Sequence, residues 1–272
     1  MAPTELDAAL LPGCLALSAE AGWNQTAEDW SVFFGRGTVF GVVEDGRPVA
    51  TGAVLPYDGG FGWISMVLVT PARRGRRLGT RILEIGLEEL ARLGRVPVLD
   101  ATPAGERVYR PLGFRPQFGL TRWQGPSGGG VPAGVRAMSM HDVAAAVAAD
   151  ALAFGAERAL LLGGFLGRAP EHAFVLENGV GFVLARPGRV ALQIGPLVAE
   201  REEDAWLLLE AAVGRATGPV FLDLADRWES LAAWLQERGF VKQRSFLRMA
   251  HGRDTPFGDP SRLFVAAGPE FG

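Results

Sequence analysis

The stretch Val67-Leu-Val-Thr-Pro-Ala-Arg-Arg-Gly-Arg-Arg-Leu-Gly-Thr80 decides how this chain is interpreted. Its first residues are apolar and typical of a strand. Pro71 ends that strand, because proline has no N–H to donate to a ladder. Gly75 and Gly79 allow a tight turn, and a helix is predicted from Leu78 onward. The stretch therefore predicts a strand that leads through a short turn into a helix.

A helix start of this kind is suited to binding an anion. The first backbone N–H groups of a helix have no internal partner, and they carry about half a positive charge from the helix dipole. The turn adds charged donors that can hold phosphate through paired hydrogen bonds, Arg73, Arg74, Arg76 and Arg77. A solvated basic loop and a nucleic-acid contact are the alternatives. The strand–proline–turn–helix setting favours phosphate binding.

The rest of the first half is predicted to be a mixed α/β unit. A helix is expected over residues 4–21, and a second begins at Thr26-Ala-Glu-Asp29, a pattern typical of a capping box. Asp45-Gly46 predicts a tight hairpin turn. The other expected elements are strands at 39–44, 48–55, 61–69, 96–100 and from 114, a helix at 78–93, and a helical turn at 108–112.

A second half with a similar order follows a segment rich in glycine and proline. Helices are expected at 142–152, 157–167, 202–215 and 228–238, and strands at 190–198, 220–224 and from 240, with a hairpin turn at Asn178-Gly179. We therefore predict an α/β (α+β) chain with domains at 1–124 and 135–272, joined by a linker at 125–134. Pairing of the two sheets across the linker stays open.

The first half resembles the GNAT superfamily of N-acetyltransferases. Their acetyl-CoA motif, Arg/Gln-x-x-Gly-x-Gly/Ala after a strand ending in Val-x-Pro, is similar to Arg74-Gly75-Arg76-Arg77-Leu78-Gly79 after Val69-Thr70-Pro71. Arg77 stands where the first glycine is expected. The resemblance implies that Val67, Leu68 and Val69 hold the pantetheine arm of acetyl-CoA, and that the turn through Thr80 holds its pyrophosphate.

A second motif of the same family is Tyr109-Arg-Pro-Leu-Gly113-Phe114, which is similar to Tyr-x-x-x-Gly-Phe. The resemblance implies that Tyr109 protonates the leaving CoA thiolate, while a purely structural tyrosine is the alternative. Thr102 stands where many relatives carry asparagine.

The second half resembles the companion domain of a tandem subgroup and is expected to lack cofactor. Glutamates and an aspartate begin its helix at 202, where they would repel a pyrophosphate. Leu235 occupies the position that matches Tyr109 and has no proton to donate. Each of the two GNAT-like domains is expected to be a mixed, mostly antiparallel sheet flanked by helices.

Direct transfer, as the resemblance implies, needs an amine that has lost its proton. The strand Gly62-Trp-Ile-Ser-Met-Val-Leu-Val69 carries no carboxylate, so Asp100 at the end of the next strand is the first candidate for base or ammonium anchor. A turn-capping aspartate is the alternative. Further residues are expected to contact the acceptor or, in the alternative reading, to be core or ion-pair residues: Trp23, Asp29, Trp30, Asp150 and Arg158.

The composition of the chain limits which other classes of function are expected. The chain has 272 residues, 48% of them hydrophobic, and a net charge of −3, which disfavours a nucleic-acid-coating protein. Scattered histidines predict no metal site, and the lone Cys14 is expected in the core. We expect a cytoplasmic enzyme, monomeric or homodimeric, that uses acetyl-CoA and a small-molecule amine, with no membrane or nucleic-acid partner. A non-catalytic sensor of acetyl-CoA or CoA is the alternative from another class.

Overall fold

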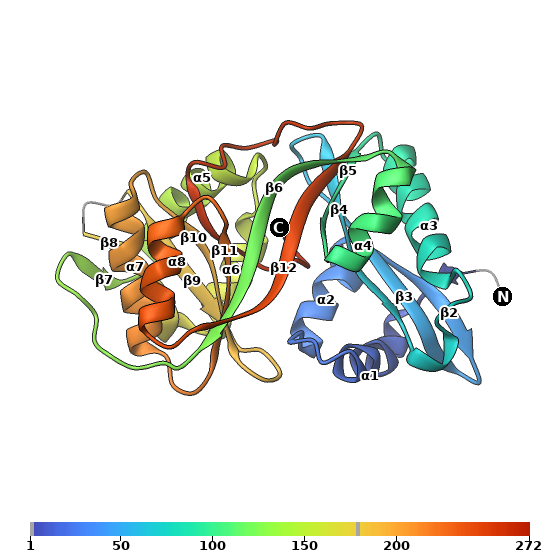
Figure 1. Cartoon of the computed structure of the whole chain (residues 1–272), viewed down its shortest axis with the longest axis horizontal. Coiled ribbons are helices and arrows are strands. Elements are labelled where there is room, and N and C mark those ends of the chain that lie inside the picture. Colours follow the sequence, from blue (N-terminus) through green and yellow to red (C-terminus); the bar gives the residue numbers. More distant parts are fainter. Residues whose placement is uncertain (1–2, 178–179) are drawn as a thin grey trace. The chain divides into compact units, whose positions relative to one another are not determined.

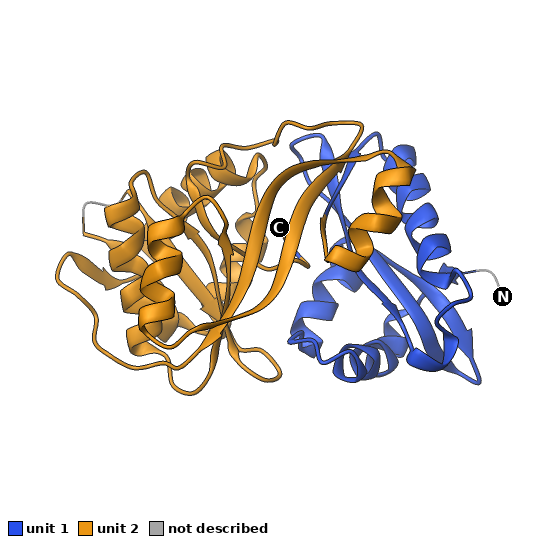
Figure 2. Cartoon of the chain, in the orientation of Figure 1, with its two compact units in different colours: residues 1–99, 271 blue, residues 100–270, 272 orange. Residues whose placement is uncertain are grey.

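The computed structural model describes residues 3–177 and 180–272, so the predicted turn at Asn178-Gly179 lies outside the described residues. The chain divides into two compact units, coloured separately in Figure 2. Unit 1 runs to Leu99 and includes Phe271. Unit 2 comprises Asp100–Glu270 together with Gly272.

Unit 1 is built on a sheet in which the strands follow one another in chain order. Its strands are β1 (Thr4–Glu5), β2 (Thr38–Glu44), β3 (Arg47–Pro56), β4 (Phe61–Val69) and β5 (Val96–Ala101), whose last two residues belong to unit 2. Neighbouring strands are antiparallel except β4 and β5, which are parallel. Its helices are α1 (Leu11–Glu20), α2 (Ala27–Arg36) and α3 (Leu78–Arg92), with 3-10 turns η1 (Ala8–Leu10) and η2 (Pro71–Arg73) (Figure 1).

Local signals in unit 1 are confirmed with one exception. Asp45 and Gly46 form the hairpin turn with φ of 49° and 73°, and Thr26 caps α2 in the expected capping box. The helix predicted over residues 4–21 is wrong at its start. Thr4 and Glu5 pair with β2 instead, and α1 begins only at Leu11, where the next residue is a proline that suits the first turn.

Unit 2 also has a central sheet, with the order β12-β6-β11-β13-β10-β9-β8-β7. Its strands are β6 (Phe114–Gly125), β7 (Val135–Ala137), β8 (Phe174–Leu176), β9 (Phe182–Arg186), β10 (Leu192–Val198), β11 (Val220–Ala225), β12 (Val241–His251) and β13 (Leu263–Ala266). Its helices are α4 (Pro103–Tyr109), α5 (Val143–Phe154), α6 (Ala159–Arg168), α7 (Glu202–Arg215) and α8 (Glu229–Glu237), with η3 (Arg110–Leu112), η4 (Met140–Asp142) and η5 (Pro170–His172).

The compact units divide at residue 99 rather than at the expected linker. The reason is β6, which pairs along its length with β12 and β11, from Phe114 opposite His251 to Gly125 opposite Val220. The expected linker is packed at its start, since Gly125 ends β6 and the Gly128 N–H donates to the Val213 carbonyl at 3.0 Å. The last strand of the first half therefore completes the sheet of unit 2.

No helix in the described part of the chain is both long and apolar enough to cross a bilayer.

Candidate active site

A β-bulge interrupts β4 in the middle of the predicted pantetheine strand. Thr51 lies opposite Leu68 and Ala53 lies opposite Ser65, so β4 uses one residue more than β3 over the same distance. Met66 takes up the extra length with φ of 55°, and the Thr51 hydroxyl donates to the Met66 carbonyl at 3.0 Å. A bulge bends its strand and redirects the groups that follow it.

The pairing of β4 with β5 ends before β4 reaches the bulge. The two strands pair from Phe61 opposite Val96 to Trp63 opposite Val98, and within the described residues this parallel ladder goes no further. Residues 64–69 of β4 continue beyond the last pair of this ladder. An unpaired strand edge presents free N–H and C=O groups, so this edge can hydrogen-bond an extended ligand.

The turn after β4 leads directly into α3, as predicted. Gly75 has φ of 77° and Arg77, the residue before α3, has φ of 60°. No side chain caps this helix, so the first N–H groups of α3 are available to a ligand. Arg77 therefore adopts the left-handed conformation that glycine tolerates best.

The four arginines of the turn have different roles. Arg73 forms a salt bridge with Glu44 on β2, its Nε lying 2.7 Å from Oε2, and this contact lowers the pKa of Glu44. Arg74 donates to the Val69 carbonyl at 3.2 Å. Arg74, Arg76 and Arg77 are exposed and have no salt bridge within the described residues. Three arginines without salt bridges in the described chain thus lie in the turn before an uncapped helix start, a combination that fits a pyrophosphate.

Tyr109 closes the short helix α4 of unit 2. Thr102 begins this helix as its N-cap, accepting from the Gly105 N–H at 3.2 Å. The tyrosine ring lies beside Gly105 and 5.9 Å from the ring of Phe114. Burial raises the pKa of Tyr109 to about 12. The phenol therefore keeps its proton at neutral pH, as a general acid must.

Asp100, the first candidate for base or ammonium anchor, is paired with an arginine. Its two carboxylate oxygens accept from Nε and Nη2 of Arg248, both at 2.9 Å, and its side chain is 1% exposed. Burial raises the pKa of Asp100, and the charge of Arg248 opposes this shift. Both oxygens are occupied, so Asp100 is better described as the partner of Arg248 than as a base or as the cap of the next turn.

Asp150 and Arg158, expected either to contact the acceptor or to be ion-pair residues, form a buried ion pair. Asp150 lies in α5, whereas Arg158 lies in the turn before α6. The guanidinium donates twice to the carboxylate at 2.8 and 2.7 Å, and both side chains are fully buried. Arg158 also donates to the main-chain oxygen of Gly272 at 2.6 Å. The pair holds the end of the chain and leaves no face for a substrate.

The expected acceptor residues near α2 are mostly structural. Asp29 completes the capping box with Thr26, and its oxygen accepts from the Thr26 N–H at 2.9 Å. Trp30 is fully buried and donates to the Ser18 hydroxyl at 3.0 Å. Trp23 is half-buried and keeps exposed surface. Of the three, only Trp23 stays a candidate for contact with an acceptor.

Ser65 is a candidate site residue that was not predicted from the sequence, because the prediction considered only carboxylates on this strand. Its hydroxyl is buried, directly precedes the bulge and has no hydrogen-bond partner in the described part of the chain. A buried polar group without a partner is costly, so it requires an explanation. A polar residue in an otherwise apolar strand was the available signal.

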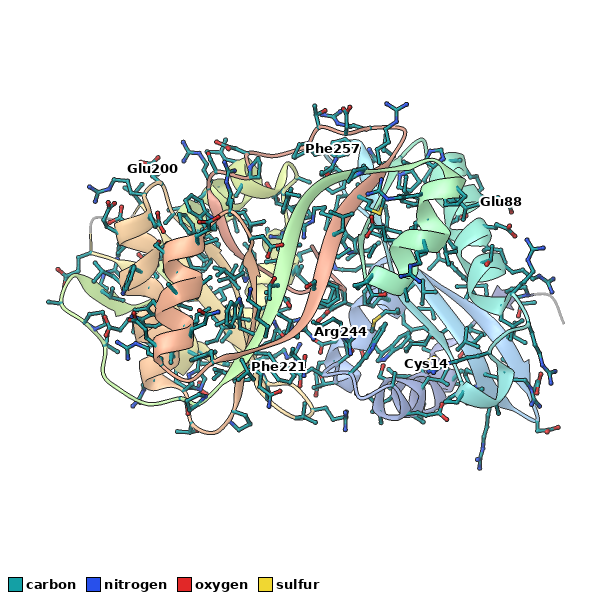
Figure 3. All side chains as sticks on the ribbon, in the orientation of Figure 1. Cys14, Glu88, Glu200, Phe221, Arg244 and Phe257 are labelled. Carbon is teal, nitrogen blue, oxygen red and sulfur yellow. The ribbon has the colours of Figure 1, made fainter. Side chains whose placement is uncertain are left out.

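Cys14, labelled in Figure 3, is fully buried in α1 as expected. Burial raises the pKa of its thiol to about 12. The thiolate is the reactive form of cysteine, so this residue is not a nucleophile at neutral pH.

The corresponding place in unit 2 is occupied by the chain itself. β10 and β11 also form a short parallel ladder, from Leu192 opposite Val220 to Ile194 opposite Leu222. Beyond it, β13 lies between them and pairs with both, with Val265 opposite Leu197 and Leu224. Residues 64–69 of β4 thus have no such strand inserted between them and β5 within the described chain, whereas β13 lies between β10 and β11 in unit 2.

The helix after β10 is also unsuited to a phosphate. α7 begins with Glu202, Glu203 and Asp204 in its first turn. Arg201 directs its guanidinium to Asp204 at 2.8 Å, so the local cation is already neutralised.

Comparison with known proteins matches both halves of the chain to acetyltransferase models. The model of the acetyltransferase (GNAT) family matches residues 13–114, and a second acetyltransferase (GNAT) domain model matches residues 146–265. The holothin acyltransferase of Pseudoalteromonas sp. (strain SANK 73390) is 26% identical over 261 residues, covering 92% of this chain and 87% of that protein.

Solved structures share the fold. A Pyrococcus horikoshii protein classed with the acetyltransferases superposes with a TM-score of 0.82 at 18% identity, over 99% of this chain and 95% of that one. A tandem GNAT protein from the clavulanic acid biosynthesis pathway superposes with a TM-score of 0.62 at 15% identity, over 91% and 97% of the two chains.

The fold and the site together define an acyl-transferring protein of α/β type. The chain belongs to the GNAT family of acetyltransferases, as two domains in tandem.

Proposed function

We propose that this chain is an N-acetyltransferase that transfers the acetyl group of acetyl-CoA to the primary amine of a small molecule. The observation that carries the proposal is the free edge of β4, which runs past its bulge to an uncapped helix start beside three arginines without salt bridges. The family uses acetyl-CoA as its donor. The holothin acyltransferase supports transfer of an acyl group in a related chain.

Acetyl-CoA is proposed to lie along unit 1 with its pantetheine on β4 and its pyrophosphate at the start of α3. Val67, Leu68 and Val69 hydrogen-bond the pantetheine through their backbone. The N–H groups at the start of α3, from Leu78 to Thr80, hold the pyrophosphate together with Arg74, Gly75, Arg76, Arg77 and Gly79. A backbone N–H near the bulge stabilises the oxyanion that develops when the amine attacks the thioester carbonyl.

Two side chains are proposed to serve the reaction directly. Tyr109 gives its phenolic proton to the departing CoA thiolate, the role that the resemblance to the family implies. The Ser65 hydroxyl accepts a hydrogen bond from the acceptor amine and orients it, which explains why this buried group lacks a partner within the described chain. Water then receives the proton of the ammonium, because Asp100 is engaged by Arg248.

Only unit 1 is proposed to bind the donor. In unit 2, β13 fills the gap beside β10 and carboxylates begin α7. Tyr109 belongs to the first half of the sequence, although it clusters with unit 2.

The sensor alternative has one specific observation in its favour. Arg77 replaces a glycine at the approach to the pyrophosphate, and its side chain can slow binding and release. Release of free thiol from acetyl-CoA across a broad panel of primary amines decides between the two. Amine-dependent thiol release supports catalysis, whereas saturable acetyl-CoA binding without any turnover supports the sensor.

A further inference from the structure

A row of polar side chains crosses the sheet of unit 2. Arg244 on β12 lies opposite Arg122 on β6, and Arg122 lies opposite Asp223 on β11. The Gln193 amide of β10 donates to Asp223 at 3.1 Å. Residues directly opposite one another in a ladder place their side chains on the same face, so these groups share one surface of the sheet.

Within this row, Arg122 and Asp223 satisfy one another. The guanidinium donates through Nε and Nη2 to both carboxylate oxygens, each at 2.8 Å, and both side chains are buried. The rings of Phe221, labelled in Figure 3, and Phe246 each lie 5.5 Å from the Arg122 guanidinium. Arg122 is therefore closed to an outside ligand.

Arg244, also labelled in Figure 3, differs from its neighbours. It is half-buried, and neither a carboxylate nor a carbonyl partner is found for it among the described residues. The other buried or half-buried arginines of unit 2 each have such a partner, namely Arg122, Arg158, Arg168, Arg186, Arg248, Arg253 and Arg262.

Leaving Arg244 in this state is unfavourable. Burial and the nearby charge of Arg122 both lower its pKa, while Asp223 opposes the shift. The guanidinium still stays protonated, because its pKa in proteins remains far above neutrality. A half-buried cation opposite a like charge costs free energy unless an anion compensates it.

We propose that Arg244 is the cation of a binding site for one carboxylate of a small molecule. The charges that act on it, Arg122 and Asp223, are already paired with one another, so Arg244 leaves a single positive charge. A carboxylate cancels that charge, whereas a phosphate dianion leaves an excess beside Asp223. A carboxylate also matches the guanidinium fork through two parallel hydrogen bonds.

The carboxylate has two sources, the acceptor amine itself or a separate small acid that regulates the protein. The first source names the acceptor as an amino acid-like amine, and that part alone rests on the proposed function. Binding of the carboxylate to Arg244 does not depend on acetyl transfer.

Binding is tested on the full chain by calorimetry and thermal shift at fixed ionic strength. The probes are acetate, succinate and benzoate, each compared with its neutral amide. We expect at least one acid to bind where its amide does not. Arg244→Gln should weaken that binding at least tenfold, while Arg115→Gln, which removes an exposed cation from β6, should leave it unchanged. Equal behaviour of acids and amides, or full binding by Arg244→Gln, overturns the proposal.

Kinetics with acetyl-CoA shows whether the carboxylate belongs to the acceptor. The acceptors are compared as an amino acid and its amide, such as β-alanine and β-alaninamide. If the acceptor carries the carboxylate, Arg244→Gln raises the KM of the acid at least tenfold and leaves that of the amide unchanged. If a separate acid binds, the acid probes change kcat without competing with the amine. Arg244-dependent binding without any acetyl transfer supports the site and contradicts the proposed function alone.

Discussion

Arg77 holds the backbone conformation that glycine adopts most easily, at the point where the turn becomes α3. Its φ of 60° places it in the left-handed region, and no side chain caps the helix there. Left-handed conformations cost a residue with a side chain about 1 kcal/mol or more. The sequence showed that a glycine was replaced, and the structure shows what that replacement costs.

Substitution of this arginine tests the strain. We expect Arg77→Gly to raise the Tm by a few degrees, corresponding to about 1 kcal/mol at this chain length. Arg76→Gly removes a neighbouring cation at a position without positive φ, so it should not raise the Tm. A Tm for Arg77→Gly at or below that of Arg76→Gly, measured by calorimetry, would show that the turn is not strained.

Tyr109 makes a second prediction at this scale. Tyr109→Phe should lower kcat about a hundredfold or more, the usual contribution of a general acid. The phenol stays protonated up to a pH of about 12, so Tyr109 should produce no fall in rate between pH 7 and 10. In that range the rate should rise as the acceptor amine loses its proton. Retention of most activity by Tyr109→Phe assigns this tyrosine to packing against Phe114.

Ser65 is the third residue whose role can be measured. Ser65→Ala removes a buried hydroxyl that has no partner within the described chain, so we expect an unchanged or higher Tm. The KM of the acceptor amine should rise about fivefold to tenfold, as for loss of one hydrogen bond. Ser31→Ala, which removes an exposed hydroxyl from α2, is the control. A fall in Tm without change in KM would make Ser65 a structural residue.

At the scale of elements, β4 and β10 share one arrangement, a strand that pairs with a parallel neighbour only over its first residues. Each strand begins a parallel ladder with its neighbour and then departs from it. Beside β4 the described part of the chain inserts no strand, and beside β10 it inserts β13. The edge that we propose for the donor in unit 1 therefore has no equivalent in unit 2.

The helix start of α3 can be tested through its charges. Arg74→Ala combined with Arg76→Ala should raise the Kd of acetyl-CoA at least tenfold and reduce its dependence on salt, because exposed cations act through screened attraction. Arg36→Ala removes an exposed arginine from the end of α2 and serves as the control. An equal effect of the control would show that only the net charge of the chain matters.

Arg244 offers a stability test on β12. Without ligand, Arg244→Gln should raise the Tm, because the substitution removes a half-buried charge opposite Arg122. An arginine that only supports the sheet would instead lower the Tm when it is lost. Thermal unfolding of both proteins in a buffer without carboxylates makes the comparison.

Elements with local signals were predictable from the sequence. The capping box at Thr26, the turn at Asp45 and the start of α3 at Leu78 each depend on a few neighbouring residues. The position of β13 was not, because its pairing joins segments that are far apart in the chain. The partners of Asp100 and Asp150 were missed for the same reason: a carboxylate in a sequence does not show which arginine will neutralise it.

For the whole molecule, the two domains have diverged from a similar plan. The family models match both halves, but the compact units divide at residue 99 because β6 completes the sheet of unit 2. The pairing of β6 with β11 and β12 joins segments far apart in the chain, so a glycine-rich segment could not predict it. Of the proposed sites, the edge of β4 lies in unit 1, whereas Tyr109 and Arg244 lie in unit 2.

The central claim is that acetyl-CoA binds to unit 1 alone, along β4 and at the start of α3. Isothermal titration of the full chain with acetyl-CoA tests it most directly, with the Arg74→Glu and Arg76→Glu double variant in parallel. We predict about one site per chain in the wild type and a loss of affinity of at least a hundredfold in the variant. About two sites per chain, no binding to the wild type, or unchanged affinity in the variant would contradict the account.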